Sequence, residues 1–205
     1  HGLTLHHAAK RVFTDLSIGL SEGDRIGVVG RNGEGKSTLL GLLAQTIEPE
    51  SGEVIHRTGL TVGVLPQQDD LLETDTVIEA IMGDTPEYVW ASDARIRDIL
   101  AHLLLEVKTD TLVGELSGGQ RRRVQLARLL SGTWDILMMD EPTNHLDMHG
   151  IKWLAQHLNE YNRNGRGALV VISHDRWFLD EVCTTMWEVH DETVDSFEGG
   201  YSAYI

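Results

Sequence analysis

A glycine-rich octapeptide at residues 30–37 has the residue types needed to hold a phosphate chain. It reads Gly-Arg-Asn-Gly-Glu-Gly-Lys-Ser, which fits G-x-x-x-x-G-K-[ST], and it lies between an apolar run at 25–29 and a helical pattern at 36–44. Glycines let the backbone N–H groups point inward, and the following helix adds about half a positive charge at its N-terminus. We expect Lys36 to reach the β- and γ-phosphates and Ser37 to offer its hydroxyl to Mg²⁺. A simple glycine-rich turn is disfavoured, because a random chain of this length has about a one per cent chance of carrying the pattern. The residues expected to hold the phosphates are Gly30, Asn32, Gly33, Gly35, Lys36, Ser37 and Thr38.

Two adjacent carboxylates follow a second apolar run. The run Ile136–Met139 predicts a strand, which would bring Asp140 and Glu141 to the carboxyl edge of a sheet, where open α/β folds bind ligands. Asp140 is suited to hold Mg²⁺, directly or through water, and Glu141 to polarise an attacking water beside the γ-phosphate. An isolated Asp-Glu pair is as often a solvated turn. The phosphate loop in the same chain favours the catalytic interpretation.

A Ser-Gly-Gly turn opens a third segment of chemical interest. Ser117, Gly118, Gly119 and Gln120 precede an amphipathic helical pattern, so backbone N–H groups, the Ser117 hydroxyl and a helix N-terminus could together receive an anion. Alone, such a turn would indicate only a helix cap. Its place after a phosphate loop gives it more weight.

The elements that must position these residues follow from hydrophobic patterning. Apolar, β-branched runs predict strands at 25–29, 61–65, 136–139, 168–172 and 186–189. Helical patterns lie between them at 36–44, 120–130, 150–161 and 175–182. Strands that alternate with helices predict a largely parallel α/β sheet. The stretch from about 68 to 115 has helical spacing without a clear strand and is predicted to be a helical lobe, whereas the opening 3–20 predicts a small antiparallel β-layer.

Composition limits the partners and the compartment. Seventeen basic and 32 acidic residues give a net charge of −15, which disfavours broad electrostatic binding of nucleic acid. The longest apolar runs are far shorter than the about 18 to 20 residues that span a bilayer. A single cysteine, Cys183, indicates a reducing, cytoplasmic location and is interpreted as structural because no basic neighbour is evident in the sequence. The absence of an initial Met leads us to expect a piece of a longer polypeptide.

Other conspicuous residues favour plainer interpretations. Ten histidines show no zinc-finger or His-Glu-x-x-His spacing, and five tryptophans are scattered, which is typical of packing. The run Arg121–Arg123 could contact RNA, but arginines at a helix start more often form a solvated face or pair with carboxylates.

The order of these motifs resembles the nucleotide-binding domains of ATP-binding-cassette (ABC) proteins over nearly the whole chain. The motifs are the phosphate loop, Leu65-Pro66-Gln67, Leu116–Gln120, Asp140-Glu141, Asn144–Asp147 and Ser173-His174-Asp175. The resemblance implies a P-loop NTPase of α/β class, with an ATPase core at about 1–67 and 126–205 and a helical lobe carrying the signature motif at about 68–125. It further implies Mg²⁺-dependent hydrolysis of ATP to ADP and phosphate in a head-to-tail sandwich of two cassettes.

The same resemblance implies roles for individual residues. Gln67 matches the residue that senses Mg²⁺ and the attacking water, His174 the switch histidine at the γ-phosphate, and Asp147 the loop residue that communicates across the dimer. The metal set is then Ser37, Gln67 and Asp140, and the catalytic set is Glu141, His174, Gln67 and Lys36. Ser117, Gly118, Gly119, Gln120 and Asp147 would serve the nucleotide of the opposite cassette.

Three further segments, Glu141–Asp147, Ser173–Asp180 and Gly199–Tyr204, look like the ABC-F branch, which carries two cassettes in one polypeptide. This implies a first cassette whose partners are a second cassette, in the same polypeptide or as a homodimer, and the ribosome, in translation control or antibiotic protection. The alternative is the ATPase subunit of a transporter with membrane subunits as partners, and a chromosome or repair ATPase is weaker because no long coiled coil interrupts the chain.

Two features depart from the family pattern. Residues 1–12 contain no aromatic residue to stack on adenine, which leaves Phe13 or a histidine as a substitute, and the lobe of about 48 residues is too short for the paired-helix arm of some members.

Overall fold

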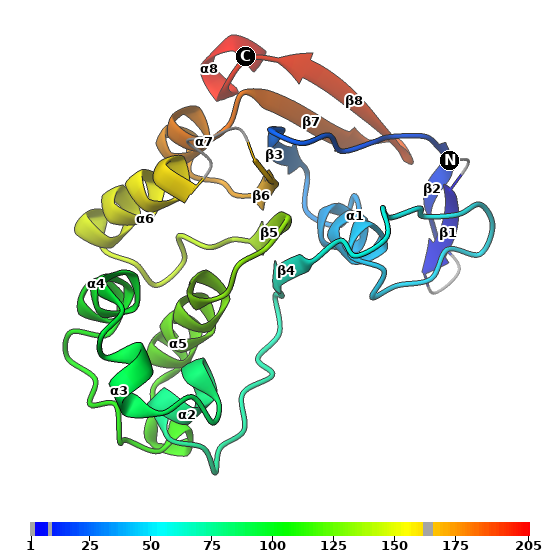
Figure 1. Cartoon of the computed structure of the whole chain (residues 1–205). Helices are drawn as coiled ribbons and strands as arrows, with labels where there is room; N and C mark the ends of the chain where they lie inside the picture. The colour runs from blue at the N-terminus through cyan, green and yellow to red at the C-terminus, as the bar shows by residue number, and fades with distance from the viewer. Residues whose placement is uncertain (1–2, 8–9, 162–165) are drawn as a thin grey trace. The chain divides into compact units, whose positions relative to one another are not determined.

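The computed structural model describes residues 3–7, 10–161 and 166–205 (Figure 1). The chain divides into two compact units. The first comprises residues 1–64, 134–142 and 155–205, and the second comprises residues 65–133 and 143–154. Each unit is described by itself.

A six-stranded sheet organises the first unit. Its strands are β3 (Arg25–Gly30), β4 (Val62–Leu65), β5 (Ile136–Asp140), β6 (Ala168–Ile172), β7 (Thr185–His190) and β8 (Thr193–Glu198), in the order β4-β5-β6-β3-β7-β8. Strand β3 is parallel to both β6 and β7, and β5 is parallel to β6. The carboxyl ends of β3, β5 and β6 therefore meet at one edge of the sheet, as the sequence predicted for a parallel arrangement.

Burial explains which strands the sequence revealed. All five residues of β5 and of β6 are buried, so both strands read as continuous apolar runs. Strand β8, antiparallel to β7, was not predicted, because four of its six residues are exposed and it lacks an apolar run. Four helices follow these strands or the loops after them: α1 (Lys36–Leu43), α6 (Met148–Tyr161), α7 (Arg176–Val182) and α8 (Tyr201–Tyr204). The sequence predicted the first three, and the short α8 was not predicted.

A separate two-stranded antiparallel sheet opens the chain, as predicted. It pairs β1 (Leu3–His7) with β2 (Lys10–Leu16). Phe13 of β2 is fully buried in the hydrophobic core of the first unit, where it packs with Leu16, Ile26 and Leu39. Its ring is not available to stack on a base, so the structure excludes Phe13 as a substitute for the missing adenine aromatic.

The second unit is helical, as the spacing of its apolar residues predicted. It contains α2 (Val77–Met82), α3 (Glu87–Trp90), α4 (Ala94–Leu103), a 3₁₀ turn (Val113–Glu115) and α5 (Gly118–Ser131). Side chains of Thr76, Asp93 and Ser117 cap the N-termini of α2, α4 and α5. Its buried apolar residues include Val77, Ile96, Ile99, Leu103 and Val124.

Within the described residues, none of the helices combines the length and the apolar character that crossing a bilayer requires.

Candidate functional site

The phosphate loop connects β3 to α1, and its glycines adopt conformations that other residues rarely reach. Gly30, Gly33 and Gly35 have φ values of 144°, 83° and 104°. A Cβ atom on Gly30 would lie 2.4 Å from the carbonyl oxygen of Val189, and one on Gly35 would lie 2.4 Å from Val12 Cγ1. Glycine is required at both positions on two counts, the positive φ and the space.

Lys36 begins α1 and is held inside this loop. Its ammonium group donates to the carbonyl oxygens of Gly30 at 2.8 Å and of Arg31 at 3.1 Å, and the residue is 8% exposed. An ammonium group has three N–H donors, so these two bonds leave one for a phosphate oxygen. Burial lowers the pKa of Lys36, while Glu141, Asp140 and Glu34 act in the opposite direction. Nearby, Asn32, Gly33 and Ser37 are exposed, and Thr38 is half-buried.

Ser37 and Asp140 meet although 103 residues separate them in the sequence. The Ser37 hydroxyl donates to Asp140 Oδ2 at 2.5 Å, which joins the start of α1 to the end of β5. Asp140 is itself 4% exposed. A hydroxyl and a carboxylate are oxygen ligands of the kind Mg²⁺ selects, and neighbouring ligands of an octahedral Mg²⁺ lie about 3 Å apart. The pair therefore fits a Mg²⁺ ion with a shift of about 0.5 Å.

Glu141 follows directly and points toward His174. Its Oε1 lies 3.1 Å from His174 Nε2, and the side chain of Glu141 is 17% exposed against 65% for His174. The backbone of Glu141 has φ 51°, and its N–H donates to Ile172 of β6 at 2.8 Å. A glutamate rarely adopts a left-handed conformation, and such strain persists only where the surroundings impose it. Here the bond to β6 fixes the backbone while the side chain lies beside His174.

The environment of Glu141 raises the pKa of its carboxyl group. Burial is the largest cause, and the charge of Asp140 acts in the same direction. Two groups act to lower this pKa without cancelling the rise: His174, through its charge and its backbone N–H, and Lys36, through its charge. A carboxylate held in this way binds a proton more readily than one in water, which suits a general base.

The signature turn lies in the second unit, at the start of α5. Ser117 and Gln120 form a capping box, in which the Ser117 hydroxyl accepts from the Gln120 N–H at 3.2 Å and Gln120 Oε1 accepts from the Ser117 N–H at 2.9 Å. Gly118 is exposed, and a Cβ on Gly119 would lie 3.4 Å from His145 Nδ1. Asp147 is also exposed and accepts from the Gly150 N–H at 2.8 Å, at the start of α6.

The predicted site residues thus fall into two groups. The first unit brings Lys36, Ser37, Asp140, Glu141 and His174 to the carboxyl ends of its strands. Gln67, which is exposed, belongs with Ser117–Gln120 and Asp147 to the second unit. The structure describes each group within its own unit.

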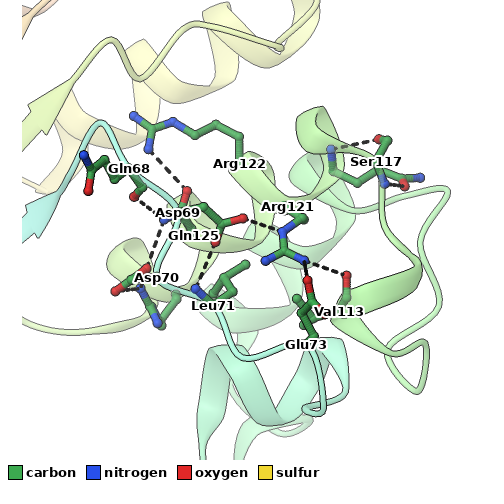
Figure 2. Close-up of polar contacts among 12 residues, drawn as sticks. Gln68, Asp69, Asp70, Leu71, Glu73, Val113, Ser117, Arg121, Arg122 and Gln125 are labelled. Carbon is green, nitrogen blue, oxygen red and sulfur yellow. Dashed lines mark hydrogen bonds and ion pairs between the residues drawn. The ribbon is translucent and has the colours of Figure 1, made fainter.

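The arginines of α5 form contacts that sequence reasoning left open. Arg121 pairs with Asp69 and Arg123 with Glu106, so two of the three adjacent arginines are neutralised by carboxylates. This favours the ion-pair interpretation over RNA contact. The polar network between α5 and residues 66–73 was not predicted (Figure 2). A signal was present, because Asp69 and Asp70 come just after Gln67 and residues 121, 125 and 128 share one helix face.

Cys183 does have a basic neighbour, which corrects the sequence interpretation. The charge of Arg25, a residue 158 positions earlier, acts to lower the pKa of the thiol, but burial raises it to about 12. The cysteine is 4% exposed and stays protonated, so it remains a structural residue for a different reason from the one expected.

Comparison with known proteins identifies the family. The family model described as ABC transporter matches residues 13–144, well over half of the chain. Energy-dependent translational throttle protein EttA of Mycobacterium tuberculosis is 35% identical, and the match covers 97% of this chain and 41% of EttA. Ribosome protection protein VmlR of Bacillus subtilis is 34% identical, with coverage of 95% of this chain and 31% of VmlR. Tylosin resistance ATP-binding protein TlrC of Streptomyces fradiae is 34% identical, with coverage of 100% and 44%.

The alignments also show a difference in length. The chain spans about two fifths of EttA, and their alignment covers 236 positions although this chain has 205 residues, so EttA carries residues that this chain lacks. The alignment with VmlR covers 194 positions.

Solved structures share the fold. An ATP binding subunit of an ABC transporter superposes with a TM-score of 0.83 at 20% identity, over 96% of this chain and 88% of that chain. An archaeal ribosome recycling factor, solved in complex with a ribosomal stalk protein, gives a TM-score of 0.82 at 25% identity, over 98% of this chain and 39% of that chain. The chain belongs to the ABC transporter family of ATP-binding domains, and within it most resembles the ABC-F proteins.

Proposed function

We propose that this chain binds and hydrolyses ATP with Mg²⁺ as one half of a head-to-tail pair of cassettes, and that the whole protein acts on the ribosome. The observation that carries the catalytic part is the position of Glu141. Its carboxylate has a raised pKa, lies 3.1 Å from His174 and directly follows Asp140, which binds Ser37 of the phosphate loop. A carboxylate held beside a phosphate loop can orient and deprotonate a water molecule.

In the proposed reaction a water oxygen attacks the γ-phosphorus in line with the bond to the β–γ bridging oxygen. That P–O bond breaks, ADP leaves, and Glu141 accepts the proton of the water. Lys36 and the loop N–H groups stabilise the negative charge on the phosphate oxygens. Ser37 and Asp140, with Gln67 from the second unit, would hold Mg²⁺, which neutralises charge on the β- and γ-phosphates. His174 would orient Glu141 and contact the γ-phosphate.

The head-to-tail arrangement rests on the exposed signature turn. The backbone N–H groups at Gly118 and Gly119 start a helix of 14 residues, and the Ser117 side chain is already committed to its own cap. These N–H groups are suited to a phosphate chain presented by another cassette. Asp147, which is exposed in the same unit, would contact that cassette as well. The opposite cassette is either a second domain of the same polypeptide or a second copy.

The ribosomal part of the proposal rests on relatives. EttA and VmlR are named for translation and ribosome protection, and TlrC for tylosin resistance. We therefore propose translation control or antibiotic protection rather than transport. Any ribosome contact that depends on the additional residues of EttA is not proposed for this chain.

Co-sedimentation with ribosomes tests both parts. The full-length protein carrying Glu141→Gln, and the equivalent change in its second cassette, should pellet with ribosomes in the presence of ATP and not in its absence, because ATP that cannot be hydrolysed holds the pair closed. Lys36→Ala is the matched control and should not pellet. ATP binding without any ribosome enrichment would contradict the ribosomal role, and co-purification with membrane subunits would then support the transporter alternative.

A further inference from the structure

The segment that follows β4 is attached to one face of α5. Within the second unit, residues 66–73 run along the first three turns of this helix (Figure 2). Arg121, Gln125 and Arg128 occupy helical positions i, i+4 and i+7, so they point to the same side. We call the contacts of Arg122, Gln125 and Arg128 with this segment the α5 clamp.

The clamp holds the backbone on both sides of Gln67. Arg122 donates through Nη1 to the carbonyl oxygen of Pro66, and Gln125 Nε2 donates to the carbonyl oxygen of Gln68 at 3.1 Å. The residue between them, Gln67, is exposed. Two side chains of one helix therefore fix the two carbonyl groups that flank Gln67 while its own side chain stays accessible.

The next residues anchor the segment further. Asp70 accepts from Gln125 at 3.0 Å and from Arg128 Nη2 at 2.6 and 2.8 Å, and Asp69 pairs with Arg121. Burial raises the pKa of Asp70, but the hydrogen bonds from Gln125 and Arg128 together outweigh it and the pKa lies below the usual value. The carboxylate is therefore charged and bound at neutral pH.

The burial of Gln125 indicates that the clamp fixes the position of residues 66–73 on α5 and does not serve only to fill space. Gln125 is 2% exposed, and its amide is satisfied, since Nε2 donates twice and Oε1 lies 3.3 Å from Arg122 Nη1. An apolar residue of the same volume would pack here without desolvating an amide. A buried amide that bonds to a backbone carbonyl instead fixes one register of the segment against the helix.

We infer that Arg122 and Gln125 are positioning residues for Gln67. This deepens the proposed function, because it rests on Gln67 taking part in hydrolysis. With the clamp intact, the backbone of Gln67 moves together with α5, whose first turn carries Ser117. Loosening the clamp lowers the rate of the chemical step and leaves the phosphate loop of the first unit unchanged.

The test is Gln125→Met in the full-length protein. Methionine keeps the unbranched shape and the burial but removes the hydrogen bonds. We expect kcat for ATP hydrolysis to fall about tenfold, the effect of losing one buried hydrogen bond. Affinity for a fluorescent ATP analogue should be unchanged, and the melting temperature should stay well above the assay temperature. Gln156→Met is the matched control, since Gln156 is an exposed residue of α6 and the same change there removes a hydrogen bond to Glu160, and its kcat should equal that of wild type.

A double-mutant cycle separates positioning from a structural role. If Gln125 acts through Gln67, then Gln125→Met should cause no further loss of kcat in a Gln67→Ala background. A full and additive loss in that background, or an unchanged kcat in the single variant, would overturn the inference. Should Gln125→Met fail to fold, Asp70→Asn is measured in the same cycle with the same criteria. If wild type hydrolyses ATP and Gln125→Met is as fast, only this inference fails, whereas a wild type without hydrolysis overturns the proposed function as well.

Discussion

Replacing Glu141 with Gln is the sharpest perturbation of the proposed chemistry. Glutamine keeps the shape of the side chain and the backbone bond to Ile172, but it cannot accept a proton. The Ser37–Asp140 hydrogen bond and the Lys36 contacts do not involve Glu141, so the phosphate loop should keep its structure. Removing a negative charge beside Asp140 also removes repulsion toward the phosphates. ATP affinity should therefore be equal or higher.

The expected loss of rate follows from the role of a general base. Such a group contributes about 10²- to 10⁴-fold, which corresponds to about 3–5 kcal/mol of barrier. We expect single-turnover release of γ-phosphate to slow by this factor in full-length protein that carries the equivalent change in its second cassette. Titration with a fluorescent ATP analogue gives the affinity in parallel.

Glu141→Asp is the matched control for this experiment. Aspartate keeps the charge but withdraws the carboxylate by one methylene, and it tolerates the φ of 51° at least as well as glutamate. Its rate should lie between those of wild type and Glu141→Gln. A rate for Glu141→Gln within about threefold of wild type would refute the assignment of the base, because that is far below the contribution of proton transfer.

Three further outcomes are expected. Lys36→Ala should weaken nucleotide binding by at least about tenfold in the same titration, because the loop then lacks its charged donor to the phosphates; unchanged affinity would contradict this. Because burial raises the pKa of Glu141, this carboxylate binds a proton at a higher pH than an ordinary carboxylate does. We therefore expect kcat to decline as the pH is lowered, with the midpoint of the decline above a pH of about 4.5. The same decline should be missing from the pH profile of Glu141→Gln. Gly30→Ala should destabilise the fold by about 2 kcal/mol or more in chemical denaturation, because its Cβ would meet the Val189 carbonyl, and an unchanged midpoint would refute the packing argument.

Much of the fold was predictable because burial and local pattern coincide. Strands β5 and β6 are buried along their whole length, and their apolar runs give both the element and its end. The functional residues then follow from position, since Asp140 ends β5 and His174 comes two residues after β6. Strand β8 and the four-residue helix α3 escaped prediction because neither has a regular buried face.

The parts of the site that could not be predicted depend on contacts between distant residues. Arg122 and Pro66 are 56 positions apart, and Ser37 and Asp140 are 103 apart. A sequence pattern gives the type of a residue, but the partner is fixed only when the elements pack. The left-handed φ of Glu141 is a further case, because no local signal favours it and the bond to Ile172 imposes it.

The residues that set the protonation of Glu141 and the residues of the α5 clamp lie in different units of the chain. The titratable groups that set the pKa of Glu141 are Asp140, His174 and Lys36, and all three belong to the first unit. The clamp belongs wholly to the second unit. Loosening the clamp should therefore lower kcat without moving the midpoint of its acid decline, whereas His174→Ala should move that midpoint upward, because the charge of His174 lowers the pKa of Glu141. A Gln125→Met profile displaced along the pH axis would show that the clamp acts on the base itself, and the division between the two units would then be wrong.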